Sequence, residues 1–152
     1  MHRKVVPDIV DQQKIELLPA STTVRDAARN MAERHIGAVL VGKGRRLEGI
    51  FTERDVLTRV VARGLDPDST TLDKVMTPNP ETLSVRSAVA YALNKMSVGG
   101  FRHIPVVDDE QRPAFVVSVR DVVEFLVQYF PREVLNLPPE EGVKRQQARE
   151  GA

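Results

Sequence analysis

The chain of 152 residues contains the same plan twice. Residues 23–61 and residues 84–127 each begin with a hydroxyl residue followed by Val-Arg and continue through an amphipathic stretch and an apolar stretch. Each then reaches a Thr/Ser-x-Arg-Asp tetrapeptide before another apolar stretch. A solenoid needs three or more repeats to bury its core, so two copies predict two half-domains that pack on each other. Two related halves also predict two related clefts, and clefts are where small ligands bind.

Composition and charge exclude several classes of partner. The 22 basic and 21 acidic side chains leave a formal charge of +1, which gives no overall attraction to nucleic acid or to a membrane surface. The absence of cysteine excludes disulfides and thiolate metal sites and fits a reducing compartment. No apolar run is long enough to cross a bilayer. Pro7 and Asp8 interrupt the first apolar run, so the N-terminus does not have the pattern of a signal peptide. We therefore expect a cytoplasmic protein that binds neither nucleic acid nor membrane.

Local patterns predict an α/β fold with a helix, two strands and a second helix in each copy. In the first copy a helix begins after Thr23 and ends at Gly37, and strands at 38–41 and 47–51 flank a turn. The second helix begins at Thr52. Its expected inward face consists of Val56, Leu57, Val60 and Val61.

The second copy predicts the same elements. Ser84 caps a helix that is about one turn longer than its counterpart, strands follow at 104–107 and 114–117, and Ser118 begins the last helix. Between the copies, residues 64–80 are rich in Asp, Pro, Ser and Thr, which is typical of a linker.

Three segments carry a family resemblance. Residues 75–78 read Val-Met-Thr-Pro, and residues 49–55 read Gly, two apolar residues, Thr, two further residues and Asp. Together with the strand opening at 101–107, these segments resemble the cystathionine-β-synthase (CBS) domain, in the order in which that family has them. The resemblance spans residues 8–128, which is most of the chain.

This resemblance implies a tandem CBS pair, or Bateman module, of the stand-alone bacterial type. Repeats at 8–66 and 67–130, each with a short leading strand, would pack with pseudo-twofold symmetry. Independently of the resemblance, residues 137–152 have few apolar side chains, so we expect 131–152 to form a partly mobile C-terminal segment. Such modules bind adenosine-containing ligands. The resemblance therefore implies AMP, ADP, ATP or NAD as the ligand, no required cofactor, a homodimer, and a protein target that the sequence does not identify.

The Thr52/Asp55 and Ser118/Asp121 elements have two interpretations. Where a strand stops at a hydroxyl residue and a helix begins, free backbone N–H groups suit a phosphate, and the carboxylate one turn later can accept hydrogen bonds from a ribose diol. The same spacing is also an ordinary capping box, which only satisfies helix N–H groups. The family resemblance favours ribose contact.

The remaining candidates also have two interpretations each. Arg54 and Arg120 stand just before the two aspartates and either reach phosphates or stay solvated. Arg102 and His103 either line one cleft or have structural roles. The complete set of expected ligand-binding residues is Ile36, Gly37, Ala38, Thr52, Arg54, Asp55, Arg102, His103, Pro105, Ser118, Arg120 and Asp121.

The second copy departs from the family pattern at one position. Phe115 stands where the first copy has Gly49, and it either fills the core or narrows a cleft. The second site is for that reason less defined in shape, although Ser118 and Asp121 are both present.

Patterns typical of catalysis and metal binding are missing from the sequence. It has no Gly-x-Ser-x-Gly, no His-Glu-x-x-His and no Gly-x-x-x-x-Gly-Lys-Ser/Thr motif, and its 3 histidines have no metal-ligand spacing. We therefore expect neither an enzyme nor a metal site. Two functions remain: a regulatory module that senses adenine nucleotides, or a protein–protein scaffold or dimerisation module with vestigial clefts. The aspartate in both copies favours the first, and Phe115 favours the second.

Overall fold

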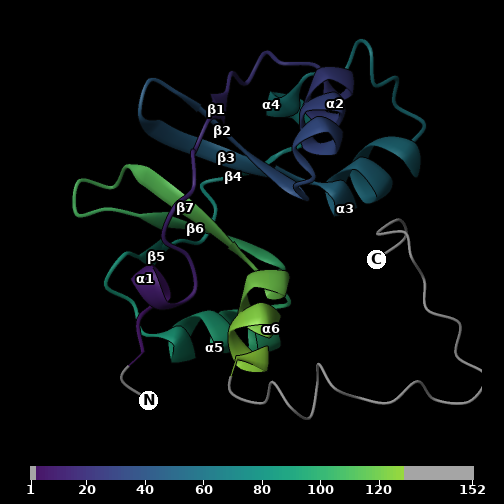
Figure 1. Cartoon of the computed structure of the whole chain (residues 1–152). Coiled ribbons are helices and arrows are strands. Elements are labelled where there is room, and N and C mark those ends of the chain that lie inside the picture. The colour runs from purple at the N-terminus through teal and green to yellow at the C-terminus, as the bar shows by residue number, and fades with distance from the viewer. Residues whose placement is uncertain (1–2, 129–152) are drawn as a thin grey trace, which may run out of the picture.

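The computed structural model describes residues 3–128, so the C-terminal segment expected at 131–152 lies outside the described residues. Two sheets lie one above the other, each with its own helices (Figure 1). The first sheet has the order β1 (Leu17–Leu18), β2 (Ala38–Lys43), β3 (Arg46–Thr52), β4 (Thr77–Pro78). The second has the order β5 (Leu83–Ser84), β6 (His103–Val107), β7 (Pro113–Ser118). The predicted α/β class and the two repeats are confirmed.

The two halves share their strand pairings, which gives the fold its pseudo-twofold symmetry. In each, a two-residue strand pairs in parallel with the first strand of an antiparallel hairpin: β1 with β2, and β5 with β6. In the hairpins, Ala38 pairs with Thr52, and His103 pairs with Ser118. The hydroxyl residue that begins the last helix therefore faces the same strand position in both halves.

The first helix of each half has the same length, so the extra turn predicted for the second copy is wrong. Helix α2 (Val24–Arg34) and helix α5 (Val89–Gly99) each contain 11 residues. Thr23 caps α2 as predicted, because its hydroxyl accepts the Asp26 N–H at 3.2 Å. The chain leaves α2 at His35, which adopts the left-handed conformation (φ 53°), and not at Gly37 as expected.

Ser84 does not cap α5, which is a second correction. Ser84 lies in β5, and α5 begins after Ala88, whose side chain makes no capping bond. The neighbouring Leu83 is buried in the core of the second half at 4% exposure, and this burial holds the segment in strand pairing with β6. The Ser-Val-Arg similarity between the copies therefore does not mark equivalent positions, and the structural counterpart of Thr23 is Ala88.

The leading segment of each repeat packs in the other half. Helix α1 (Val5–Asp8), at the N-terminus, joins the second half: the Val5 N–H donates to Ser87 O at 2.8 Å. Helix α4 (Leu72–Val75), which lies at the start of the second repeat, joins the first half: the Leu72 N–H donates to Thr22 O at 2.9 Å. Figure 1 shows the purple N-terminal helix beside the lower sheet and the teal α4 beside the upper one.

Each half has its own core, and a third cluster joins them. The first core is formed by α2, β2, β3 and α4, and includes Val39, Phe51 and Leu72. The second is formed around α5, β6 and β7, and includes Val5 from the exchanged α1. Ala38 and Leu40 alternate with the core-facing residues of β2, and with Ile50 they form the third cluster, against which Val116 of the second half packs. Strand β2 is thus buried on both faces.

The last helix of each half buries only part of its apolar stripe. Helix α3 (Glu53–Asp55) continues as the π-helical segment η1 (Val56–Val61), and α6 (Val119–Val127) is its counterpart. Val60 is buried, but Leu57 and Val61 are 61% and 64% exposed, so their predicted inward placement is wrong. The apolar stripe of the helix is wider than the area of the helix that packs against the sheet, so the side chains at its outer edge remain exposed.

Because α4 contributes to the first core, residues 64–80 are more than a linker. Leu72 is fully buried, and we expect Leu72→Ala to lower the free energy of unfolding by about 2–5 kcal/mol, the cost of a core cavity. The control is Leu65→Ala in the same segment, at 40% exposure, which should cost less than about 1 kcal/mol. Denaturant unfolding measures both. Equal, small losses would show that α4 does not belong to the core.

Candidate functional site

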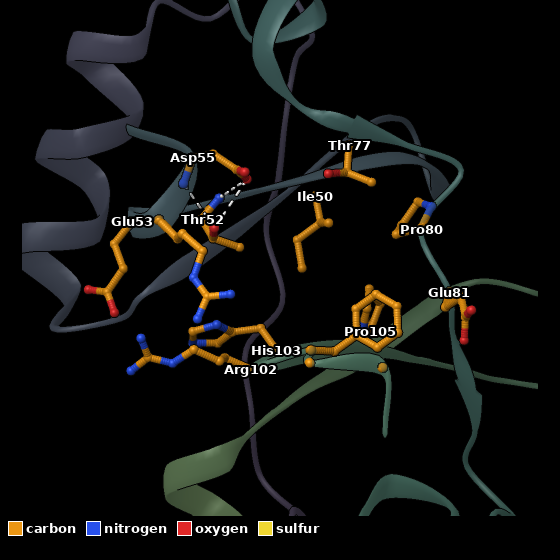
Figure 2. A pocket seen from close by; sticks show the side chains of 14 residues that line it. Ile50, Thr52, Glu53, Asp55, Thr77, Pro80, Glu81, Arg102, His103 and Pro105 are labelled. Atoms are coloured by element: carbon orange, nitrogen blue, oxygen red, sulfur yellow. Dashed lines mark hydrogen bonds between the residues drawn. The ribbon is translucent and has the colours of Figure 1, made fainter. Parts of the chain in front are cut away.

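Two clefts lie between the halves, and each takes one wall from each half. Cleft 1 combines the start of α3 with the start of β6. Figure 2 shows Thr52 and Asp55 on one side and Arg102, His103 and Pro105 on the facing side. The cleft has a volume of about 280 Å³. Its lining residues are Ile50, Thr52, Glu53, Arg54, Asp55, Thr77, Pro80, Glu81, Gly99, Gly100, Phe101, Arg102, His103 and Pro105.

Cleft 2 is the pseudo-twofold counterpart and has the same volume, about 280 Å³. It combines the start of α6 with the start of β2. Its lining residues are Gln13, Lys14, Ile15, Glu16, Arg34, Ile36, Gly37, Ala38, Val39, Leu40, His103, Val116, Ser118 and Asp121. Backbone bonds show the equivalence: the Glu53 N–H donates to Gly37 O, and the Val119 N–H donates to Arg102 O.

Both Thr/Ser-x-x-Asp elements form complete capping boxes. In cleft 1, Asp55 Oδ2 accepts the Thr52 N–H at 2.9 Å and the Thr52 hydroxyl at 3.1 Å. In cleft 2, Asp121 Oδ2 accepts the Ser118 N–H at 2.6 Å and the Ser118 hydroxyl at 2.7 Å. Capping therefore uses one carboxylate oxygen, Oδ2, of each aspartate. The other oxygen, Oδ1, is left for a second partner.

The second partner differs between the clefts. Asp55 Oδ1 lies 3.3 Å from Arg59 Nε, and Arg59 also donates to Val75 O at 3.0 Å. On α6, Phe125 stands one turn after Asp121, as Arg59 does after Asp55, and it is buried in the half-domain. Within residues 3–128, no cationic side chain forms an ion pair with Asp121.

His103 lines both clefts. Its ring packs so closely on Gly37 that a Cβ there would lie 3.0 Å from His103 Nε2 and 3.2 Å from Glu53 Oε1. Burial lowers the pKa of His103 below its ordinary value of 6.5; Glu53 and Asp121 act to raise it, and Arg102 acts to lower it. The imidazole is therefore neutral at neutral pH and serves as an uncharged partition between the clefts.

The structure brings all but one of the expected ligand residues to a cleft. Arg54, Arg102 and Pro105 lie in cleft 1, and Ile36, Gly37 and Ala38 lie in cleft 2. Arg120 lines neither cleft, because its Nε donates to Glu124 Oε1 at 3.0 Å on the outer side of α6.

Phe115 and its counterpart Gly49 both serve the cores. Phe115 packs against the second core and does not line the clefts. A Cβ on Gly49 would lie 2.4 Å from Met76 Sδ, so this glycine leaves room for Met76 beside the first core. Core filling is thus the interpretation of Phe115 that the structure supports.

Sequence reasoning missed the residues that close the outer edges of the clefts. In the first half, Thr77 of β4 pairs with Ile50 and lines cleft 1. In the second half, the Gln13 side chain takes that role: Nε2 donates to Val116 O at 2.9 Å, and Oε1 accepts the Val116 N–H at 2.9 Å. Thr77 belongs to the Val-Met-Thr-Pro motif, so its place in the site could have been predicted. No sequence pattern predicts that the Gln13 side chain forms the hydrogen bonds of a neighbouring strand.

Residues 3–128 contain no group of three histidine, aspartate or glutamate side chains that could hold a metal ion. None of the helices in this part of the chain has the length and apolarity needed to span a membrane.

A family model for the CBS domain matches residues 3–62 and 72–128. This chain belongs to the CBS-domain family. A CBS domain-containing protein of Arabidopsis thaliana is 38% identical over 114 residues, which is 75% of this chain and 20% of the plant protein. The chain thus spans about a fifth of the length of such curated relatives.

Solved structures of CBS-domain proteins have the same architecture. One from Burkholderia ambifaria has a TM-score of 0.76 at 26% identity, with 82% of this chain and 94% of that one covered. Another, a CBS-domain protein from Pyrobaculum aerophilum complexed with AMP, has a TM-score of 0.70 at 25% identity, with 82% and 96% covered.

The burial of His103 predicts a pH dependence of stability. Its lowered pKa means that the unfolded chain binds more protons at this residue than the folded protein does. His103 therefore makes its full contribution to the free energy of unfolding above about pH 6.5. This contribution is lost as the pH falls below 6.5 through the lower pKa of the folded state, by at most about 1.4 kcal/mol per pH unit.

Denaturant unfolding between pH 7.5 and 5.5 measures this contribution. His103→Asn should remove that part of the slope. His35→Asn should retain it, because His35 is exposed at the end of α2 and asparagine tolerates its left-handed backbone. Identical slopes for the wild type and His103→Asn would contradict the assignment.

Proposed function

We propose that this protein is a ligand-sensing regulatory module that binds adenosine-containing nucleotides in clefts 1 and 2. The observation that carries the proposal is the composition of each cleft: a carboxylate held by a capping box on one wall, and the start of a strand from the other half on the facing wall. A ligand in either cleft contacts both halves, so its binding is coupled to how they pack.

The chemistry of the walls suits a nucleoside. Asp55 and Asp121 offer carboxylate oxygens to a ribose diol, since a charged acceptor makes stronger hydrogen bonds than a neutral one. Ile50 and Pro105 in cleft 1, and Ile36 and Leu40 in cleft 2, supply apolar surface for a base. The AMP complex of the Pyrobaculum relative supports the same ligand class for this chain, with AMP, ADP, ATP and NAD as the candidates.

The role is regulatory and not catalytic. The aspartates of both clefts are engaged in helix capping, and His103 is packed between the clefts. The hydroxyls beside these aspartates, those of Thr52 and Ser118, also accept the Asp55 and Asp121 N–H groups, so helix capping accounts for both pairs. The signal passes to a protein target through the change in packing between the halves.

We further propose that the protein acts as a homodimer in the cytoplasm. The outer edges of the last helices leave apolar side chains exposed: Leu57 and Val61 on η1, and Val123 and Leu126 on α6. Both helices lie on the same side of the molecule in Figure 1. A twofold dimer would cover this surface, and such dimers are the commonest oligomers.

The second candidate function is a scaffold with vestigial clefts. The same exposed helical surface favours it, since that surface serves protein contact whether or not a ligand binds. Nucleotide released from the purified protein by denaturation and identified by mass spectrometry would favour the sensor.

Ligand binding predicts a thermal shift. At a hundredfold its dissociation constant a ligand stabilises the native state by about 2.7 kcal/mol, which raises the melting temperature of a chain of this length by roughly 5–10 °C. At least one of AMP, ADP, ATP and NAD should produce this shift, and Asp55→Asn and Asp121→Asn should each reduce it. If none of the four shifts the wild type, the sensor is excluded. If both variants melt lower but keep the full shift, the aspartates serve only as caps.

The exposed helical surface predicts the assembly. Leu57→Glu and Val123→Glu place a charge in the proposed interface, and each should convert the dimer to a monomer at micromolar concentration in light scattering. Val98→Glu is the control, because Val98 is 80% exposed and belongs to α5, whereas the proposed interface is formed by η1 and α6. A wild-type monomer, with and without nucleotide, would remove the proposal.

A further inference from the structure

The walls of cleft 1 carry arginines that are free to bind an anion. Arg54 and Arg102 come from opposite halves, and neither side chain has an ion-pair or hydrogen-bond partner in the described part of the chain. Two of the acidic residues of this cleft are already neutralised: Asp55 pairs with Arg59, and Glu81 pairs with Lys95. Glu53, the third acidic lining residue, forms no ion pair within residues 3–128.

Cleft 2 lacks this pair of arginines. The position equivalent to Arg102 is Gly37, and the position equivalent to Arg54 is Arg120, which is turned away to Glu124. Arg34 does line the cleft, but it pairs with Glu16 at 3.6 Å and donates to Lys14 O at 3.1 Å. Lys14 is the cationic lining residue that has no acidic partner among residues 3–128.

The carboxylates differ in the opposite sense. Asp55 Oδ1 is held by Arg59 at 3.3 Å, so a ribose diol in cleft 1 would have to compete with a guanidinium. Asp121 lines cleft 2 with no cationic partner among the described residues, so its Oδ1 is available to a diol. Cleft 1 is therefore the better phosphate site, and cleft 2 is the better ribose site.

We propose, as an extension of the function proposed above, that the two clefts select different parts of an adenosine nucleotide. Cleft 1 selects the phosphate chain through Arg54 and Arg102, and takes nucleoside di- and triphosphates. Cleft 2 selects the ribose diol through Asp121, and takes a nucleoside or its monophosphate equally well. The pair of clefts then samples the phosphorylated and the dephosphorylated members of one nucleotide pool at the same time.

The physical basis is the strength of charge-assisted hydrogen bonds. Arginine binds phosphate oxygens through two parallel N–H donors, and each such contact is worth about a factor of ten or more in affinity. The loss of a diol hydrogen bond to a carboxylate has a similar cost. Each effect should fall on one cleft and leave the other nearly unchanged.

Backbone amides that belong to a single cleft can report the two sites separately. The Thr52 amide is bonded to Asp55, and the Ser118 amide is bonded to Asp121, so their chemical shifts follow occupancy of cleft 1 and cleft 2 respectively. Titration of the full chain with adenosine, AMP, ADP, ATP and 2′,3′-dideoxyadenosine gives an apparent dissociation constant for each amide and each ligand.

From adenosine to ATP, the affinity reported by Thr52 should rise at least about tenfold, and that reported by Ser118 should change less than about threefold. Dideoxyadenosine should bind about tenfold more weakly than adenosine at cleft 2, with a smaller loss at cleft 1. Arg102→Gln should reduce the phosphate dependence of cleft 1, because Arg54 is then the one arginine of the proposed pair that remains. The matched control Arg120→Gln should retain it, because Arg120 lies outside both clefts.

Three results would overturn the proposal. Equal phosphate dependence at both amides, or an equal loss with dideoxyadenosine, would show that the clefts do not divide the nucleotide between them. Unchanged phosphate dependence in Arg102→Gln would show that Arg102 does not bind the phosphates, which contradicts the assignment of the phosphate chain to the arginine pair. A failure of the parent function looks different, since no adenosine compound would then move either amide.

Discussion

The fold depends on the exchange of leading segments between the two halves. Lys4 bridges to Ala88, and Thr71 bridges to Thr23, so each first helix is anchored at its start by a segment that belongs to the other repeat. Val5 and Leu72 follow these bridges and are fully buried in the cores that they join. Neither half can separate from the other without opening a core. This constraint keeps the two halves joined face to face, and it thereby preserves the clefts between them.

The symmetry of the two clefts follows from the repeated backbone of the two halves, and the differences between the clefts arise from single side chains. The backbone repeats closely enough that capping boxes, strand starts and cleft volumes correspond. The side chains at equivalent positions differ, however: the second half has Arg102 where the first has Gly37, and the first half has Arg59 where the second has Phe125. The same architecture thus supplies one cleft with free guanidinium groups and the other with a free carboxylate. Capping and binding are compatible, because each box uses one carboxylate oxygen.

The sequence predicted the parts of the fold that depend on local pattern. The α/β class, the two hairpins and the Thr52 and Ser118 capping boxes follow from apolar periodicity and spacing. It did not predict the exchange of α1 and α4, because a short segment with few apolar residues shows no sign of which half it will join. The misplacement of Ser84 as a helix cap has the same cause, since a two-residue strand is held by tertiary pairing and not by its own propensity.

The candidate site was predicted in its residues more than in its arrangement. Thr52, Asp55, Arg102 and His103 were expected from motif and resemblance, and the structure places them around one cleft. The ion pair of Arg59 with Asp55 and the strand-like role of Gln13 depend on side chains that meet only in the folded chain. Likewise, the exposure of Leu57 depends on how much of the helix the neighbouring sheet covers, and this cannot be predicted from the spacing of apolar residues along the helix.

In the proposed binding mode one ligand bridges both halves in each cleft, and two double variants distinguish this mode from binding within a single half. Equilibrium dialysis with labelled ADP counts the sites per chain that keep wild-type affinity. Arg102→Gln combined with Asp55→Asn alters cleft 1 alone, so one site should remain at wild-type affinity. Arg102→Gln combined with Asp121→Asn alters both clefts, so none should remain. The reverse pattern, with Arg102 and Asp121 acting on a single site, would show that each site lies within one half, and would contradict the bridging of the two halves by one ligand.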